Sequence, residues 1–262
     1  MEVEMAIIGG TGFYQPEIME GTEELVIDTK YGEAVLQVGY YRDRKLAFLA
    51  RHGRHHGIPP HKINYRANIA ALQKIGVKRV LATTAVGSLR KDLLPGELVI
   101  IDQFIDFTKF RYHTFYDGEG GTVVHTDFTE PYCRQSREQL KLVMEEREIT
   151  FTYGGTYICT EGPRYETPAE IRAFAGWGAD VVGMTNVPEA TLAREANLCY
   201  ANLALVTNLA AGLSPDLLTH KEVVEIVNDN INIIRELFME TLRSMPEERT
   251  CLCWYKEDFS LG

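Results

Sequence analysis

Short apolar runs rich in β-branched residues recur along this chain, and stretches with hydrophobic residues at helical spacing lie between several of them. Such runs are typical of strands buried inside a parallel sheet. They predict strands over residues 5–8, 45–50, 79–83, 97–101, 154–160, 179–184 and 200–207.

Helical periodicity is clearest in two segments. Between Asn64 and Gly76 the apolar residues recur at helical spacing, and the glycine ends the helix. Thr219 and Glu222 form a capping box, and the amphipathic pattern that follows predicts a long helix to about Ser244. Further helices are expected over residues 134–147 and from Val187 onward.

The alternation of strands and helices predicts the fold class. We expect a single α/β domain over residues 1–246, with a mixed, mostly parallel central sheet flanked by helices. A chain of 262 residues is long enough for one large domain of this kind. Residues 247–262 show no clear period, and we expect them to form a C-terminal tail.

Charge and composition exclude several classes of partner. The formal net charge is −10, which argues against a nucleic acid or a membrane surface, since both require a basic footprint. An anionic small substrate would instead need a local cationic pocket. The N-terminus carries acids where a signal peptide is basic, and no apolar run could span a bilayer, so we expect a cytoplasmic protein.

The chain contains five cysteines, an odd number that favours free thiols in a reducing compartment. Cys251 and Cys253 stand one residue apart near the end of the chain. A disulfide, a redox role and a loosely packed tail are the alternatives for this pair.

Polar or glycine-rich groups follow the predicted strands one after another. They are Thr11, Arg51 with His52, Thr84, Thr185 and Asn208. Because a parallel sheet gathers the carboxyl ends of its strands at one edge, these groups predict a ligand pocket there.

Two neighbouring motifs suggest which ligand this pocket binds. The glycine-rich turn at residues 9–12 lacks the third glycine of a dinucleotide fingerprint, so a phosphate site or a plain tight turn fits better. The histidine-rich loop at residues 51–61 lacks the spacing of a metal site, and we expect no metal there. Arg51 and His52 in this loop are predicted to supply positive charge to an anion.

Residues 107–132 show little periodicity and many aromatic side chains. A long irregular segment of this kind inside a compact domain is usually functional or lies at an interface.

Seven blocks match one known family in order. They are GGTGF, LARHGRHHGIPPHKINYRANI, TTAVGS, GELVIIDQFIDFT, EGPRYET, WGADVVGMTNVPEATLAREA and VTNLAAG. The chain therefore resembles the trimeric purine nucleoside phosphorylases and methylthioadenosine phosphorylases over residues 5–240. The resemblance implies the nucleoside phosphorylase fold and phosphorolysis of a purine nucleoside without a metal or an organic cofactor. It also implies a homotrimer, with a hexamer as the alternative, and, in members from hyperthermophiles, a C-terminal Cys-x-Cys pairing.

The same resemblance implies roles for individual residues. Phosphate would be bound by Thr11, Arg51, His52, Thr84, Ala85 and Thr185, with His52 also counted as catalytic. The nucleoside would be bound by Tyr165, Met184, Ala85 and Gly87. His125, in the aromatic segment, would reach the site of a neighbouring subunit.

Three positions depart from the methylthioadenosine branch, and all favour a 6-oxopurine nucleoside. Asn208 replaces an aspartate and can donate to N7 and O6 of the base. Glu166 replaces a serine and can accept from N1–H, a proton that adenine lacks. His220 stands where purine nucleoside phosphorylases place a histidine near the 5′-hydroxyl.

We therefore expect a purine nucleoside phosphorylase acting on inosine and guanosine in purine salvage, with Asn208 and Glu166 as catalytic residues. The alternatives are a methylthioinosine phosphorylase, a methylthioadenosine phosphorylase and a non-catalytic purine sensor. The intact set of phosphate residues argues against the sensor.

Overall fold

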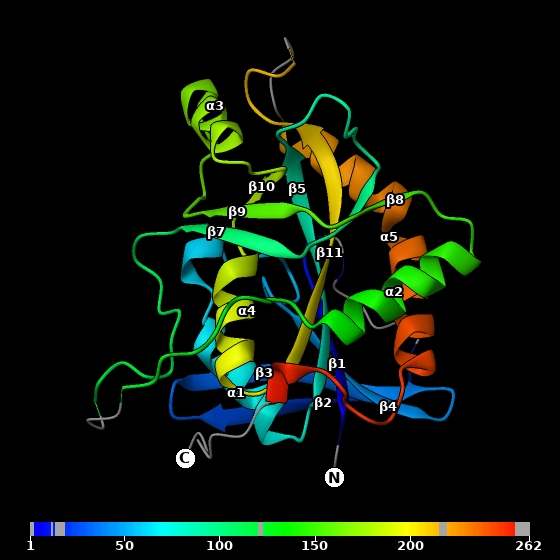
Figure 1. Ribbon diagram of the computed structural model, residues 1–262. Helices are drawn as coiled ribbons and strands as arrows, with labels where there is room; N and C mark the ends of the chain where they lie inside the picture. The colour runs from blue at the N-terminus through cyan, green and yellow to red at the C-terminus, as the bar shows by residue number, and fades with distance from the viewer. Residues whose placement is uncertain (1–2, 12, 14–18, 120–122, 215–218, 255–262) are drawn as a thin grey trace.

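Two long strands, β5 (Arg79–Ser88) and β11 (Cys199–Leu209), run side by side through the centre of the molecule (Figure 1). The computed structural model describes residues 3–11, 13, 19–119, 123–214 and 219–254. Both strands are almost entirely buried, as expected for apolar runs covered on both faces.

The remaining elements surround this pair. The other strands are β1 (Met5–Gly9), β2 (Glu20–Thr29), β3 (Gly32–Tyr41), β4 (Arg44–Ala50), β6 (Leu98–Ile100), β7 (Gln103–Phe107), β8 (Phe151–Tyr153), β9 (Thr156–Thr160) and β10 (Val181–Gly183). The α-helices are α1 (Tyr65–Lys74), α2 (Arg134–Glu146), α3 (Pro168–Gly176), α4 (Asn186–Glu195) and α5 (His220–Ser244). Two short 3-10 turns are η1 (Pro60–Lys62) and η2 (Leu252–Trp254).

Helices cover both faces of the sheet, which confirms the predicted α/β class. Helices α1 and α4 lie on one side in Figure 1, and α2 and α5 pack together on the other. Apolar side chains of α1 and α4, such as Leu72 and Leu192, belong to one buried cluster with the sheet. Side chains of α2 and α5, such as Leu140 and Phe238, belong to a second. The sheet is thus the middle layer of a sandwich.

The predicted helix starts are confirmed by their caps. The Asn64 side chain accepts a hydrogen bond from the Ala67 amide at the start of α1. Thr219 and Glu222 form the reciprocal capping box at the start of α5.

Among the described residues no helix is long and apolar enough to cross a membrane.

The sheet is mixed, and most of its pairings are parallel. Strand β5 pairs in parallel with both β1 and β11. Strand β10, however, runs antiparallel to β5, with Val181 opposite Ser88 and Val182 opposite Gly87. The strand that leads to Thr185 therefore reaches the site from the opposite direction, and the expectation that all the polar strand ends share one parallel edge was wrong.

Strand lengths also differ from the prediction. We expected a strand to stop at residue 83, but β5 continues to Ser88, so Thr84 lies within it. Likewise Asn208 lies within β11, just after a register shift between Val206 and Asn208. The end of β5 extends because β10 pairs with Gly87 and Ser88, and β11 extends because Asn208 and Leu209 pair with the same two residues.

The hairpin of β2 and β3 was not predicted. Most residues of β2 are exposed, because this strand lies at the edge of the sheet. The strand therefore lacks the apolar run by which buried strands are found.

The end of the described chain folds back onto the domain. The buried Arg79 side chain donates through Nη2 to the carbonyl of Pro246 over 2.6 Å. Gln135 donates through Nε2 to the carbonyl of Glu248 over 2.9 Å. The predicted boundary between residues 246 and 247 stays a prediction.

Candidate active site

A cavity of about 350 Å³ opens where β5, β10 and β11 meet. All residues predicted to bind phosphate line it, namely Thr11, Arg51, His52, Thr84, Ala85 and Thr185. So do the predicted base and sugar residues Gly87, Tyr165, Glu166, Met184 and Asn208. Segments almost 200 residues apart in the sequence thus contribute to one pocket, as expected of a substrate site.

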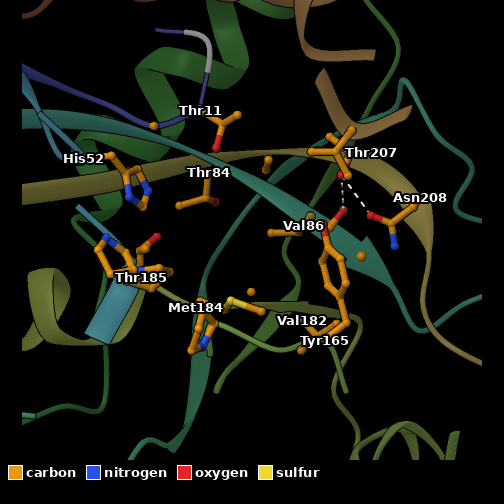
Figure 2. Close-up of a pocket in the computed structure, with 18 of the residues that line it drawn as sticks. Thr11, His52, Thr84, Val86, Tyr165, Val182, Met184, Thr185, Thr207 and Asn208 are labelled. Carbon is orange, nitrogen blue, oxygen red and sulfur yellow. Dashed lines mark hydrogen bonds between the residues drawn. The ribbon is translucent and has the colours of Figure 1, made fainter. Parts of the chain in front are cut away.

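The lining residues divide into two ends (Figure 2). Thr11, His52, Thr84 and Thr185 gather at one end, and Thr207 and Asn208 lie at the other, with Met184 between them. The first end is rich in hydroxyl groups and the second carries amide and carboxylate groups. These are suitable for a phosphate and for a heterocyclic base, respectively.

Hydroxyl groups at the first end are held by their surroundings. Thr84 donates through Oγ1 to Oδ1 of the fully buried Asn202 over 3.1 Å.

Thr185 precedes the first residue of α4, but its side chain makes no capping hydrogen bond. The positive end of α4 therefore borders this end of the cavity, which favours an anion.

Arg51 forms a buried ion pair with Glu189 of α4. Both side chains are 1% exposed, and Arg51 donates through Nε to Oε1 and through Nη2 to Oε2 of Glu189. Burial opposes the charge on Arg51, but the Glu189 carboxylate outweighs it and raises the pKa of the arginine. Tyr200 also donates to Glu189, over 2.8 Å.

His52 is neutral at pH 7 in this structure. Its Nδ1 lies 2.8 Å from the Ile58 carbonyl, and because a carbonyl only accepts, Nδ1 carries the proton. Burial, followed by the charge of Arg51, lowers the pKa of His52 from 6.5 to about 4. Nε2 is thus left with a lone pair.

These two findings change the expected electrostatics of the phosphate end. We predicted that Arg51 and His52 would supply positive charge. The Arg51 charge is instead balanced by Glu189, and His52 is uncharged. An anion would therefore be held chiefly by hydroxyl and backbone donors and by the helix end, with Arg51 as half of an ion pair.

Glu166 lies at the base end, where Thr160 donates through Oγ1 to Glu166 Oε1 over 2.6 Å. A carboxylate has further lone pairs with which it can accept a hydrogen bond from a ligand. Burial raises the pKa of Glu166, and the hydrogen bond from Thr160 opposes this effect. A buried carboxylate of this kind gains from a ligand that donates a proton to it.

The orientation of the Asn208 amide follows from its hydrogen bonds. Thr207 donates through Oγ1 to Asn208 Oδ1 over 3.0 Å, and Asn208 donates through Nδ2 to the Leu209 carbonyl over 3.0 Å. Since an amide nitrogen has two N–H groups, the second can donate to a ligand. Asn208 therefore offers a donor in the same cavity as the acceptor Glu166.

Two glycines allow the backbone to approach closely at this site. A Cβ atom at Gly183 would lie 2.0 Å from the Tyr157 hydroxyl, and one at Gly10 would lie 2.8 Å from the Thr83 carbonyl oxygen. The Tyr157 hydroxyl accepts a hydrogen bond from the Thr185 amide over 3.3 Å. Gly183 thus lets Tyr157 fix the start of α4.

Arg111 joins the irregular aromatic segment to the substrate residues. Its Nη1 donates to the Met184 carbonyl over 2.6 Å and to the Tyr65 hydroxyl over 2.9 Å. Its Nη2 donates to the Glu161 carbonyl over 2.6 Å. Met184 and the loop that carries Glu166 are therefore held by one buried guanidinium.

Two predicted residues are not brought to the cavity by the described part of the chain. His125 lines a separate cavity with Tyr116 and Arg194. His220 is the first residue of α5, but its side chain lies outside the described part. Val223, one turn further along α5, does line the main cavity.

Sequence reasoning missed the residues that hold the site from behind. They are Glu189, Asn202, Thr160 and Arg111. Glu189 had only one local signal, its position beside the start of a predicted helix. Asn202 and Arg111 contact residues far away in the sequence, and Thr160 stands in no recognisable motif.

The fold and the cavity are those of a nucleoside-cleaving enzyme family. The chain belongs to the phosphorylase superfamily, whose family model matches residues 4–243.

Named relatives and a solved structure make the relationship more specific. The chain is 55% identical over 249 residues to a probable 6-oxopurine nucleoside phosphorylase from Dictyoglomus turgidum, covering 95% of this chain and 94% of that protein. It is 48% identical over 250 residues to a probable S-methyl-5′-thioinosine phosphorylase from Methanocaldococcus jannaschii, covering 95% and 96%. A crystal structure of a methylthioadenosine phosphorylase from an antarctic soil metagenomic library is 34% identical, with a TM-score of 0.89 and coverage of 97% and 90%.

Proposed function

We propose that this protein is a 6-oxopurine nucleoside phosphorylase. It cleaves inosine and guanosine with phosphate, giving the free base and ribose 1-phosphate. The observation that carries the proposal is that Asn208 and Glu166 line one cavity, in which Thr11, Thr84 and Thr185 gather at the end away from Asn208. The names of close relatives support it.

The reaction follows from the layout of the cavity. A phosphate oxygen attacks C1′ of the sugar while the bond from C1′ to N9 of the purine breaks, and the bonding electrons move into the base. Thr11, Thr84 and Thr185 hold the phosphate beneath the sugar, which brings the reacting atoms together. Asn208 donates to N7 and stabilises the negative charge that develops on the leaving purine.

Base selection rests on the direction of two hydrogen bonds. A 6-oxopurine carries a proton on N1, which Glu166 can accept, and an acceptor at O6, to which Asn208 can donate. Adenine has no proton on N1 and carries an amino donor at C6, so Glu166 would lose its partner there and Asn208 would keep only N7. A buried polar group left unpaired costs about 1–3 kcal/mol, enough for strong discrimination.

The second candidate substrate is S-methyl-5′-thioinosine. It has the same base and differs only at the 5′ position of the sugar. Val223 and Ile58 line the cavity, and their apolar side chains suit a methylthio group better than a hydroxyl group. A relative that carries this activity in its name supports the alternative. His220 would favour the 5′-hydroxyl.

Assembly and location are further parts of the proposal. We propose a homotrimer, with a hexamer as the alternative, in which His125 completes a neighbouring subunit's site. Phe110 and Tyr112, 87% and 72% exposed, support an interface along this segment. We also propose that the protein acts in the cytoplasm, in purine salvage, and that it needs neither an organic cofactor nor a catalytic metal.

The test is phosphate-dependent release of base from four nucleosides measured in parallel: inosine, guanosine, methylthioinosine and methylthioadenosine. We expect inosine and guanosine to have the highest kcat/KM. Dominant turnover of methylthioinosine would favour the second candidate, and dominant turnover of methylthioadenosine would contradict base selection by Asn208 and Glu166. Purine binding without any turnover would indicate a sensor.

A further inference from the structure

Four of the five cysteines meet far from the substrate cavity. We call them the cysteine cluster: Cys133, Cys199, Cys251 and Cys253. Two come from the domain and two from the end of the described chain. All four Sγ atoms lie within 4.8 Å of one another, although the residues span more than 100 positions in the sequence. Such convergence is not needed for packing, because small side chains of any kind would fill the space.

We propose that the cysteine cluster binds one Zn²⁺ ion, which fastens the end of the chain to the domain. This site is separate from the phosphorolysis site and takes no part in its chemistry. The metal-free expectation from the sequence concerned the histidine-rich loop and the phosphorolysis reaction. We did not predict the cysteine cluster from the sequence, because the spacing of Cys133 and Cys199 matches no metal-binding motif.

The dimensions of the cluster suit a tetrahedral ion. Zinc binds thiolates at about 2.3 Å, which places neighbouring sulfur atoms of a tetrahedron about 3.8 Å apart. In this structure the Sγ atoms of Cys199 and Cys251 are 3.3 Å apart, and the largest separations stay below 4.8 Å. A central ion therefore needs only small shifts of side chains.

The surroundings favour a metal thiolate. Cys133 is the N-cap of α2, and its Sγ accepts a hydrogen bond from the Ser136 amide over 3.5 Å. The positive end of a helix stabilises a thiolate. Arg134 and Arg194 line a cavity beside Cys251 together with Glu130 and Glu138, so the formal charges of that lining balance. Four thiols that bind Zn²⁺ release four protons, and the resulting centre carries a charge of −2.

The cluster is closed in the manner of a structural site. Cys133, Cys199 and Cys253 are buried, and Cys251 is half-buried. Four sulfur ligands leave no open position for a substrate, and soft thiolates select zinc over magnesium or calcium. Zinc also has no redox chemistry, and it protects thiols in a reducing compartment where disulfides do not persist.

Hydrogen bonds with Arg79 and Gln135 already hold the chain up to Thr250, and the ion would add an anchor at η2. Trp254 donates through Nε1 to the Arg249 carbonyl over 3.1 Å, and this contact lies within the segment itself. Arg249 reaches the domain through the Asn197 carbonyl over 3.2 Å. One ion bound by cysteines at α2, β11 and η2 would link these three elements.

The test starts with protein purified without oxygen in a non-chelating phosphine reductant. Zinc per chain is measured by plasma mass spectrometry after zinc loading and removal of excess ion. We expect about one zinc per chain, a loss of that zinc in Cys251→Ser and Cys253→Ser, and no change in the matched control Cys159→Ala. Cys159, the fifth cysteine, lies in β9, outside the cluster.

Two further measurements keep the result independent of folding defects in the variants. Wild-type protein loaded with Co²⁺ should show the intense d–d absorption of a tetrahedral thiolate centre. Removal of zinc by a chelator should lower the melting temperature, and zinc but not magnesium should restore it. Two disulfides found by peptide mapping in protein purified without oxygen and without the reductant would overturn the proposal. So would iron in place of zinc, or zinc retained by both serine variants.

Discussion

At the scale of single residues, His52 is a histidine that the fold keeps uncharged. The unfolded chain binds a proton on this side chain near pH 6.5, whereas burial lowers the pKa of the folded state to about 4. Between these pH values the unfolded state binds more protons than the folded state. The contribution of His52 to stability is thus fully present above pH 6.5 and is lost as the pH falls towards 4.

This predicts a specific pH dependence for His52→Gln. The free energy of unfolding of the wild type, relative to that of the variant, should fall by up to about 3 kcal/mol between pH 6.5 and 4. Urea unfolding at several pH values measures it. The matched control is His55→Gln, since His55 is an exposed histidine of the same loop. Parallel curves for wild type and His52→Gln would contradict the assignment.

Residues that line the cavity could be predicted from the sequence, and residues that support them could not. Asn208 and Thr84 follow buried apolar runs, so their position near a ligand follows from strand direction alone. Glu189 pairs with Arg51 across 138 positions of sequence, and no local pattern specifies that contact. The Arg51 charge expected at the phosphate end is present, but Glu189 balances it, and burial keeps His52 uncharged.

At the scale of elements, strand identity was easier to predict than strand direction. The apolar runs of β5 and β10 both indicate burial, but an apolar run is the same in either direction. The antiparallel pairing of Val182 with Gly87 depends on how the chain returns through α3. The edge strand β2 was missed because exposed strands lack such runs.

The irregular segment at residues 107–132 acts on the site through Arg111, which makes it more than a surface loop. Arg111→Met removes the donors to the carbonyls of Met184 and Glu161. Loss of about 1.4 kcal/mol of positioning energy corresponds to a tenfold change. We therefore expect the KM for inosine to rise roughly tenfold, with a much smaller change in the KM for phosphate, in steady-state assays.

Arg66→Met provides the matched control for this prediction. Arg66 pairs with Asp117 of the same segment over 2.9 Å and stacks near Tyr112, but it is not among the residues that line the cavity. Equal effects of Arg66→Met and Arg111→Met would mean that the segment matters only for stability. An unchanged KM for inosine in Arg111→Met would contradict the positioning role.

At the scale of the whole molecule, the site is a product of the long central strands. Thr84 and Gly87 of β5 face the cavity beside Asn208 of β11, so one rigid pair of strands supports both the phosphate end and the base end. Predicting the class of fold was possible because it depends on this buried pair. The cysteine cluster was not predictable, because it needs the tail to return across the domain.

The central claim is that Asn208 and Glu166 choose the base, and the exchange of both residues tests it most directly. The measurement is the ratio of kcat/KM for inosine to kcat/KM for adenosine in wild type and in the double variant Asn208→Asp, Glu166→Ser. The account predicts that this ratio falls by at least roughly 100-fold. The substitutions remove the amide and the carboxylate that do not match adenine, and the aspartate at position 208 can accept a hydrogen bond from its 6-amino group. An unchanged ratio in a folded variant with a normal KM for phosphate would contradict it.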